Sequence, residues 1–388
     1  MFETVERNEN KFDLTLIFKR YETEIILGII FVFYLFMANF FSWSQAFDYP
    51  FLNNSGGSDP YFNYYIIQYI LTYHTQLLHE LFLNYPIGAG NPRPPFFHWM
   101  IAFVATILSP IFGVYKAAYY AFAEFDAVFG ALLIIPVYLM AKEAFGKKAG
   151  IIAAFLYALM PGNLSAGILT DGRMHTPELL FAFLAIYFFE MAIKNAKKGL
   201  FINKLSDVKS YLPSIISYYS KNKKATIYAL LSGAALGGLM LSWQGYAYIQ
   251  VIILIYVVVQ SVINLLTRKP TGYLTYITTL SMFLGFLMGA YYYYGSGLIS
   301  GWYTPEVQMA VLGIAFLILI NIIGRKPWVI TVPLTIAVSL GGFFVLLKLE
   351  PTTMHTLISG EGYFIKTRVY TTIAEAAPLP LGEYINSF

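Results

Sequence analysis

The sequence predicts an all-α polytopic membrane protein that crosses the bilayer about nine times. Of its 388 residues, 58% are hydrophobic and only 12% are charged, whereas soluble domains carry roughly a quarter charged residues. The mean hydropathy is +0.61, and apolar runs close to the ~20 residues needed to cross a bilayer recur along the chain. These observations exclude a soluble fold, and we expect no nucleic-acid partner.

The predicted spans follow one another with mostly short polar connections. In order, they cover residues 21–43, 119–140, 149–161, 178–193, 225–242, 246–266, 273–294, 307–323 and 328–347. The stretch 96–112 is also apolar, and the charges around it decide whether it crosses.

Lysine and arginine fall in alternate connections between these spans. They gather before residue 21 and in 142–148, 194–224, 268–269 and 325–326. Because positive residues favour the cytoplasmic side, we expect these loops inside the cell, with a cytoplasmic N-terminus and no cleavable signal peptide. The stretch 96–112 then cannot be a simple span and is expected at the outer membrane interface. Loop 194–224 reads as a solvated linker within reach of anionic lipid.

The same orientation gathers the polar residues of interest on the outer face of the cell membrane. The long outer loops are 44–118 and 165–176, and the chain after residue 348 is also outside. They hold Asp59, then Asp171 with His175, and finally Glu375. The sequence thus predicts a transmembrane domain over 1–348 and a last outer stretch over 349–388, with any active site on the outer face.

Asp59 stands just after the first apolar segment, directly before Pro60. Proline is favoured in the first turn of a helix, so Asp59 reads either as an N-cap or as an ion ligand at a helix start. Further along the same loop, four prolines and two glycines predict an irregular external segment. Its Arg93 could meet a lipid phosphate, although a snorkelling interfacial arginine is the commoner case.

The second outer loop ends in a helix-start pattern, Thr176 followed by a proline and Glu178. Asp171 and His175 should therefore lie in a loop aimed at the outer face, either as ligands or as part of an ordinary Asp-Gly turn. The chain contains no cysteine, so only Asp, Glu and His remain as metal ligands, and these favour Mg²⁺ or Mn²⁺.

The last outer stretch is long, mixed in composition and rich in turn residues, which is typical of a functional or mobile loop. It contains Lys366 and Arg368 upstream of Glu375. These two cations could hold a phosphate or could equally be solvated.

Taken together, these residues resemble the catalytic subunit of oligosaccharyltransferase, the membrane enzyme of asparagine-linked glycosylation, in its prokaryotic, single-subunit and above all archaeal form. The run DPYFNY from Asp59 resembles the family's first acidic motif, and the segment from Tyr85 to Pro94 resembles the one after it. LSWQGY from Leu241 resembles a Trp-x-Gly connection between two mid-chain spans, and TIAE ending at Glu375 matches the Thr-Ile-x-Glu motif. The resemblance covers essentially the whole chain.

The resemblance implies a C-type glycosyltransferase-like transmembrane domain with about nine spans. It implies Asp59 and Glu375 as catalytic carboxylates, which would orient the amide of the acceptor asparagine. It also implies that Asp59, Asp171 and His175 hold Mn²⁺ or Mg²⁺. Lys366 and Arg368 could then share the contact to the donor phosphate.

The chain departs from the family pattern at two points. The second acidic motif has an acid or histidine in third place, whereas Asp171-Gly172-Arg173 has arginine there; we therefore expect Asp171 and His175 as ligands, with Glu178 in reserve. The family also continues with further spans and a soluble domain whose Trp-Trp-Asp motif grips the acceptor, and no such tryptophan pair occurs here. The chain is then a transmembrane fragment, or acceptor recognition belongs to a missing C-terminal domain or a second chain.

The implied reaction is transfer of an oligosaccharide from a lipid-linked, dolichyl phosphate or pyrophosphate donor to asparagine in Asn-x-Ser/Thr. One alternative is another C-type lipid-phosphate-sugar glycosyltransferase, such as a protein O-mannosyltransferase. Another is a non-catalytic transporter, which would place its ionisable residues within the spans. Here most of them lie in loops; Glu124 and Asp126, expected near the outer interface, are the main exceptions.

Overall fold

The computed structural model describes residues 20–47, 58–197, 199, 209, 211–295, 303–323, 327–349 and 351. The predicted site residues Lys366, Arg368 and Glu375 lie outside these ranges. Residues 48–57, which lead up to Ser58, also lie outside them.

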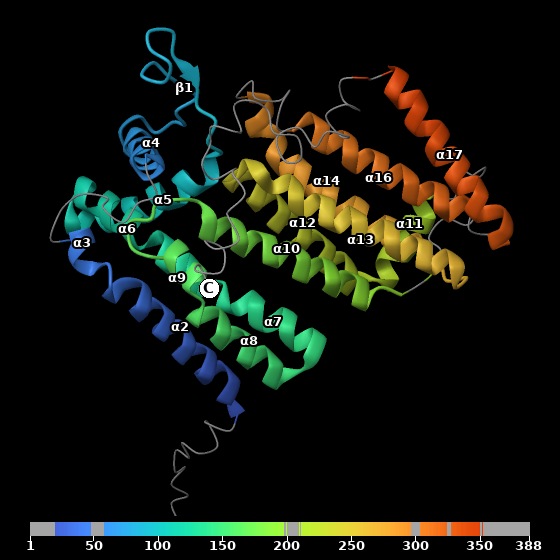
Figure 1. Ribbon diagram of the computed structural model, residues 1–388, viewed down its shortest axis with the longest axis horizontal. Helices are drawn as coiled ribbons and strands as arrows, with labels where there is room; N and C mark the ends of the chain where they lie inside the picture. The colour runs from blue at the N-terminus through green and yellow to red at the C-terminus, as the bar shows by residue number, and fades with distance from the viewer. Residues whose placement is uncertain are drawn as a thin grey trace, which may run out of the picture.

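The described chain is helical apart from one short hairpin (Figure 1). Its first half contains α2 (Glu22–Phe40), α3 (Trp43–Phe47), α4 (Asp59–Tyr73), α5 (Pro95–Phe112), α6 (Val114–Leu132), α7 (Ile134–Phe145), α8 (Lys147–Leu159), α9 (Pro161–Ala166) and α10 (His175–Asn195). Its second half contains α11 (Tyr211–Lys221), α12 (Lys223–Ser242), η2 (Gln244–Tyr246), α13 (Ala247–Leu266), α14 (Gly272–Gly295), α16 (Thr304–Ile323) and α17 (Trp328–Leu349). The all-α membrane fold is therefore confirmed.

The predicted number of about nine spans is not confirmed. Within the described residues, 7 helices are long and apolar enough to cross a membrane, not the predicted nine. The predicted span 149–161 falls on α8, which has only 13 residues, and α16 and α17 have shorter apolar segments. Conversely, α5, which we expected at the interface, is itself long and apolar enough to cross.

The helices pack around three apolar cores. One lies among α2, α6, α7 and α8, a second among α4, α5 and α6, and the largest among α10, α12, α13, α14 and α16. In the largest core α12 and α14 approach closely, since a Cβ added to Gly233 would lie 2.7 Å from the backbone oxygen of Ser281. Small residues commonly allow such close packing between membrane helices.

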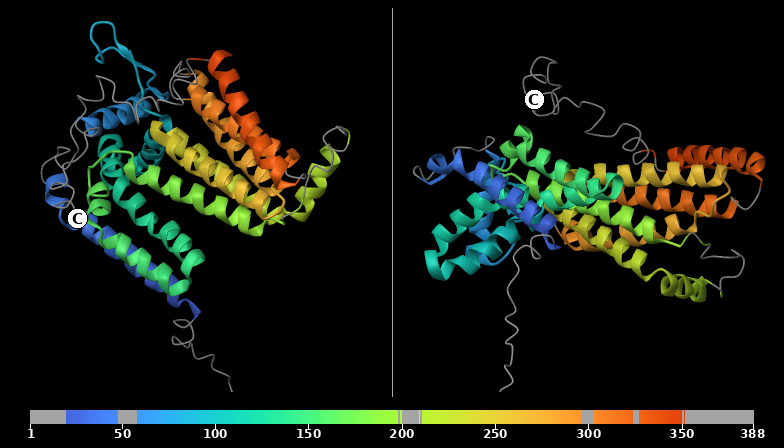
Figure 2. Two further views of the ribbon diagram at one scale, coloured as in Figure 1. Left: turned by 45° about the vertical axis from the view of Figure 1, so that its right-hand side comes forward. Right: turned by 90° about the horizontal axis from the view of Figure 1, so that it is seen from below.

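Two ion pairs join segments that the charge pattern placed on one side of the membrane. Lys147 at the start of α8 lies 3.4 Å from Glu22 at the start of α2. Lys194 at the end of α10 pairs with Glu143 near the end of α7. The beginning of α2, the turn between α7 and α8, and the end of α10 therefore share one end of the bundle, as predicted (Figure 2).

The opposite end carries a small hairpin between α4 and α5. Strands β1 (His79–Glu80) and β2 (Ala89–Gly90) pair antiparallel, with Glu80 opposite Ala89. The Glu80 carboxylate accepts hydrogen bonds from the hydroxyl of Tyr65 at 2.7 Å and the amide of Phe82 at 2.9 Å. The Phe82 bond and then the Tyr65 bond hold the pKa of Glu80 below its ordinary value.

Candidate functional site

Asp59 opens α4, and its carboxylate is ion-paired. Ser58 occupies the N-cap position and makes no side-chain capping bond, so the N-cap reading of Asp59 is wrong by one residue. Nη2 of Arg93 lies 2.5 Å from Oδ1 of Asp59, with 41% of the Asp59 side chain and 23% of the Arg93 side chain exposed. Arg93 therefore does more than snorkel at the interface: it neutralises and orients this carboxylate.

The backbone around Arg93 is fixed from several sides. Oδ1 of Asn91 accepts the amide of Arg93 at 3.0 Å, and Nδ2 of the buried Asn91 donates to the carbonyl of Leu77 at 2.8 Å. From the second half of the chain, the hydroxyl of Tyr292 donates to the carbonyl of Arg93 at 2.9 Å. Nε2 of Gln244, in the LSWQGY connection, donates to the carbonyl of Pro92, the residue before Arg93. The loop that supplies the Asp59 partner is thus anchored to α14 and η2.

In the loop that precedes α10, Asp171 is buried at 1% exposure. Arg173 binds it in a forked arrangement: Nη2 to Oδ1 at 3.1 Å, and Nε to both oxygens at 3.3 Å. Burial raises the pKa of Asp171, and the guanidinium of Arg173 opposes that rise. The arginine that departs from the family pattern is therefore the charge partner of the neighbouring acid.

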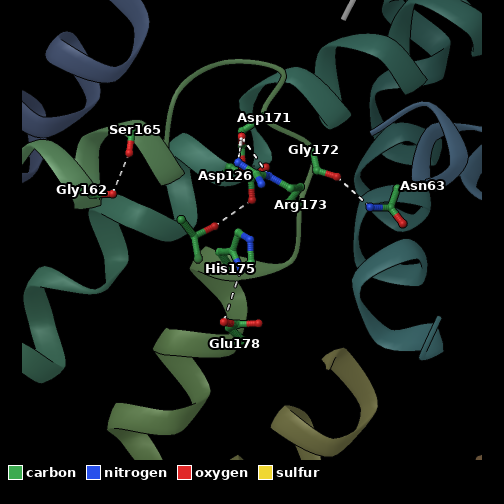
Figure 3. A network of polar contacts seen from close by, with 10 residues as sticks. Asn63, Asp126, Gly162, Ser165, Asp171, Gly172, Arg173, His175 and Glu178 are labelled. Carbon is green, nitrogen blue, oxygen red and sulfur yellow. Dashed lines mark hydrogen bonds and ion pairs between the residues drawn. The ribbon is translucent and has the colours of Figure 1, made fainter. Parts of the chain in front are cut away.

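Gly172 brings the two acidic loops together. Its φ is +58°, and an added Cβ would lie 2.2 Å from Cζ of Phe122 and 3.0 Å from Cβ of Pro60. Its carbonyl accepts a hydrogen bond from Nδ2 of the buried Asn63 at 2.8 Å. Pro60 and Asn63 both belong to the DPYFNY run, so the two acidic motifs are directly packed against one another (Figure 3).

Asn63 is itself held in one orientation. Its Oδ1 faces Nε2 of the fully buried His98 at 3.0 Å, while Nδ1 of His98 lies 3.2 Å from the carbonyl of Pro94. Because Nδ2 must donate to Gly172, Oδ1 is left to accept from the His98 ring. A buried polar chain thus joins the second loop to α4 and to the start of α5.

Asp126 is a member of this network whose role the sequence did not reveal. It lies in α6 at 1% exposure, and its Oδ1 accepts the hydroxyl of Thr176 at 2.8 Å. The backbone amides of Gly172 and Arg173 also lie close to this carboxylate. One signal in the sequence could have suggested this role: Asp126 is an acid within an apolar run, and an Asp-Gly loop follows further along the chain. Asp126 holds the turn that presents Asp171 (Figure 3).

His175, the first residue of α10, faces Glu178 rather than the acids of the first loop. Its Nδ1 lies 3.4 Å from Oε1 of Glu178, and 42% of the His175 side chain is exposed. Glu178 is 8% exposed, and its Oε2 has no hydrogen-bond partner within the described residues.

The described residues do not assemble the predicted metal site. Among them, no group of three His, Asp or Glu side chains is placed to hold an ion. Asp59 pairs with Arg93, Asp171 with Arg173, and the third predicted ligand, His175, pairs with Glu178. The structure brings the loops of the three predicted ligands close together and gives each ligand a separate partner.

Comparisons with known proteins agree with the fold. A family model described as dolichyl-phosphate-mannose-protein mannosyltransferase matches residues 92–205. The dolichyl-phosphooligosaccharide-protein glycotransferase 3 of Archaeoglobus fulgidus is 27% identical over 344 residues, which cover 83% of this chain and 37% of the relative. Glycotransferase 2 of the same organism is 25% identical over 132 residues, or 34% of this chain and 21% of the relative. The chain therefore spans well under half the length of these relatives.

A solved structure of the archaeal oligosaccharyltransferase AglB from Archaeoglobus fulgidus, with an inhibitory peptide and a dolichol-phosphate, matches with a TM-score of 0.74 and 19% identity, over 96% of this chain and 43% of that one. The apo form of the Archaeoglobus fulgidus oligosaccharyltransferase matches with a TM-score of 0.72 at 19% identity, over 92% of this chain and 41% of that one. The resemblance seen in the sequence is thereby confirmed, and this chain has the transmembrane fold of an archaeal AglB-type oligosaccharyltransferase.

Proposed function

We propose that this chain is the transmembrane catalytic part of an oligosaccharyltransferase, which transfers a glycan from a dolichol-linked phosphate or pyrophosphate donor to asparagine in Asn-x-Ser/Thr. The observation that carries the proposal is the 27% identity over 344 residues to an archaeal dolichyl-phosphooligosaccharide-protein glycotransferase. Solved relatives contain a dolichol-phosphate in one case and an acceptor peptide with an NVT sequon in another. We propose the same two classes of partner here.

The proposed orientation has the N-terminus in the cytoplasm and the two acidic loops outside. The shared end of α2, α7, α8 and α10, with its two Lys–Glu pairs, supports it, because positive residues favour the cytoplasmic side. In this arrangement α5 lies at the outer interface and α8, α16 and α17 complete about nine spans. The opposite end, with the hairpin and α4, then faces outward.

The proposed chemistry begins with the acceptor nitrogen, which is a weak nucleophile because its lone pair is delocalised into the carbonyl. Carboxylates that accept both of its N–H bonds weaken that delocalisation and aim the nitrogen at the donor sugar. We assign this role to Asp59 and Glu375. The ion pair with Arg93 neutralises the charge of Asp59 and fixes its direction.

The described residues do not fit a divalent ion in their present arrangement, since Asp59 and Asp171 each bind a guanidinium. A relative has been solved with Zn and sulfate, and Mn²⁺ or Mg²⁺ is the ion we propose for this chain. The ligands that we propose for it are Asp59, Asp171 and His175, with Glu178 in reserve. Lys366 and Arg368 are the proposed contacts for the donor phosphate.

The test is transfer to a fluorescent Asn-x-Thr peptide by the purified chain, with lipid-linked oligosaccharide and Mn²⁺. A Gln-x-Thr peptide is the matched acceptor control, and Asp59→Asn and EDTA are the site controls. We expect product only with the asparagine peptide and its loss in both site controls. If the unaltered chain neither transfers the glycan nor binds the donor, the proposal is refuted. If it binds the donor but does not transfer the glycan, acceptor recognition belongs to the part of the relatives that this chain does not cover.

A second candidate is a protein O-mannosyltransferase, favoured by the family model that matches residues 92–205. It would glycosylate a hydroxyl group instead of an amide. A peptide with serine and threonine but no asparagine distinguishes the two: glycosylation of that peptide would establish the second candidate.

A further inference from the structure

Helix α11 (Tyr211–Lys221) connects two membrane-spanning helices and belongs to neither. It lies between the end of α10 and the start of α12, and a single residue, Asn222, separates it from α12. Since α10 starts in the acidic loop and is 21 residues long, its end lies about 30 Å away from that site. Helix α11 therefore sits at the end of the bundle opposite the candidate site (Figures 1 and 2).

The helix has one apolar stripe and that stripe is uncovered. Leu212, Ile215, Ile216 and Tyr219 follow the spacing i, i+3, i+4, i+7, which puts them on one face. Their exposures are 67%, 38%, 57% and 48%. Ser217 lies on the other side of the helix and is also exposed.

The helix is nevertheless held firmly to the bundle at its C-terminal half. Tyr218 is 6% exposed, its hydroxyl donates to the carbonyl of Lys197 at 3.0 Å, and its ring meets that of Tyr276 in α14 at 5.0 Å. Asn222 accepts the amide of Lys197 at 2.7 Å and donates to the carbonyl of Tyr218 at 2.9 Å. The exposed stripe is thus carried by an anchored helix, and its exposure is not the fraying of a loose end.

Positive charge surrounds the stripe. From residue 197 to 224 the sequence has 7 lysines and a single acid, Asp207, and Lys209, Lys221, Lys223 and Lys224 are exposed. An apolar helical face flanked by lysines, located where two spans meet the membrane surface, matches a helix lying in the interface with its lysines at anionic headgroups.

We propose that α11 lies in the membrane interface at this end of the bundle and binds anionic phospholipid headgroups through its flanking lysines. Its apolar stripe enters the boundary of the acyl chains, and its polar face with Ser217 looks toward water. This inference rests on the membrane fold and on α11 itself, and it does not depend on the proposed transferase activity.

The absence of cysteine from the chain permits a direct test by site-directed spin labelling. Leu212→Cys and Ile216→Cys report on the stripe, and Ser217→Cys is the matched control one residue further round the helix. Each labelled full chain is reconstituted in nanodiscs of phosphatidylcholine alone or of an equal mixture with phosphatidylglycerol. The relative accessibility of each label to oxygen and to a water-soluble nickel complex measures its depth.

The labels at Leu212 and Ile216 are expected to be several-fold less accessible to nickel than the label at Ser217, with the difference increased by phosphatidylglycerol. In the combined variant Lys221→Gln, Lys223→Gln and Lys224→Gln, that increase should disappear while Ile216 keeps its oxygen contact. Equal nickel accessibility at Ile216 and Ser217 would overturn the proposal. So would insensitivity of the depth to phosphatidylglycerol, or spin–spin broadening at Ile216 that reveals a second copy of the chain on the stripe.

Discussion

Gly172→Ala tests whether the two acidic loops are locked together by direct packing. The backbone at Gly172 has a φ of +58°, and placing a residue with a Cβ in the left-handed region costs about 1–2 kcal/mol. The new methyl would also lie 2.2 Å from Cζ of Phe122, whose side chain is fully buried. Overpacking of this kind costs about 1–3 kcal/mol. The expected loss of unfolding free energy is therefore about 2–5 kcal/mol.

Thermal and denaturant unfolding in detergent measure this loss, and a double-mutant cycle separates its two causes. Phe122→Leu removes the ring atoms that the methyl would strike, so the combined variant should be less destabilised than the sum of the single variants by about 1 kcal/mol or more. Strict additivity would refute the packing argument and leave only backbone strain. A Gly172→Ala protein within ~0.5 kcal/mol of the unaltered chain would refute both.

Three further outcomes follow from the contacts described above. Arg93→Met should lower the initial rate of transfer at least ~10-fold, because it releases Asp59 from its partner. The unfolding free energy should change by less than ~1 kcal/mol, because the ion pair is partly exposed. Equal rates in the variant and the unaltered chain would show that the pair has no role in transfer. Thr176→Val leaves Oδ1 of the buried Asp126 without its donor and should cost about 1–3 kcal/mol in unfolding experiments, whereas Thr176→Ser keeps the hydroxyl and should cost less. The folded pKa of Glu80 is below its ordinary 4.5, so the stability that its carboxylate contributes is present above that pH and is lost as the pH falls through the folded pKa. Glu80→Gln should remove this part of the acid-induced drop in melting temperature. An unchanged pH profile of the melting temperature would contradict the lowered pKa of Glu80.

Sequence patterns predicted the helices well because apolar run length reports directly on membrane crossing. They predicted less well how many helices cross. The stretch 149–161 is apolar, but the helix that it forms, α8, is only 13 residues long. The stretch 96–112 was placed at the membrane interface because of the charges around it, although its length and composition fit a span. Length, charge and burial act together at such segments, and no one of them decides alone.

The convergence of the two acidic loops followed from charge asymmetry, but their partners did not. Arg93 was read as an interfacial arginine because its neighbours are prolines and aromatic residues typical of a membrane surface. Its pairing with Asp59 depends on the fold of the hairpin and on the anchor to Tyr292, which local sequence does not report. The role of Asp126 was missed for the same reason: its partner Thr176 lies at the start of a different helix.

The two arginines are the feature that most alters the picture drawn from the sequence. A buried carboxylate without a partner is strongly destabilising, and Asp171 is 1% exposed, so a neighbouring positive charge offsets the cost of burying it. Arg173 supplies that charge from two residues away, and Arg93 does the same for Asp59 at 2.5 Å. A guanidinium neutralises one carboxylate at a time, whereas a divalent ion draws several ligands to one point. The described site therefore holds its acids in separate, pre-oriented pairs, and any ion that gathers them must first compete with two arginines.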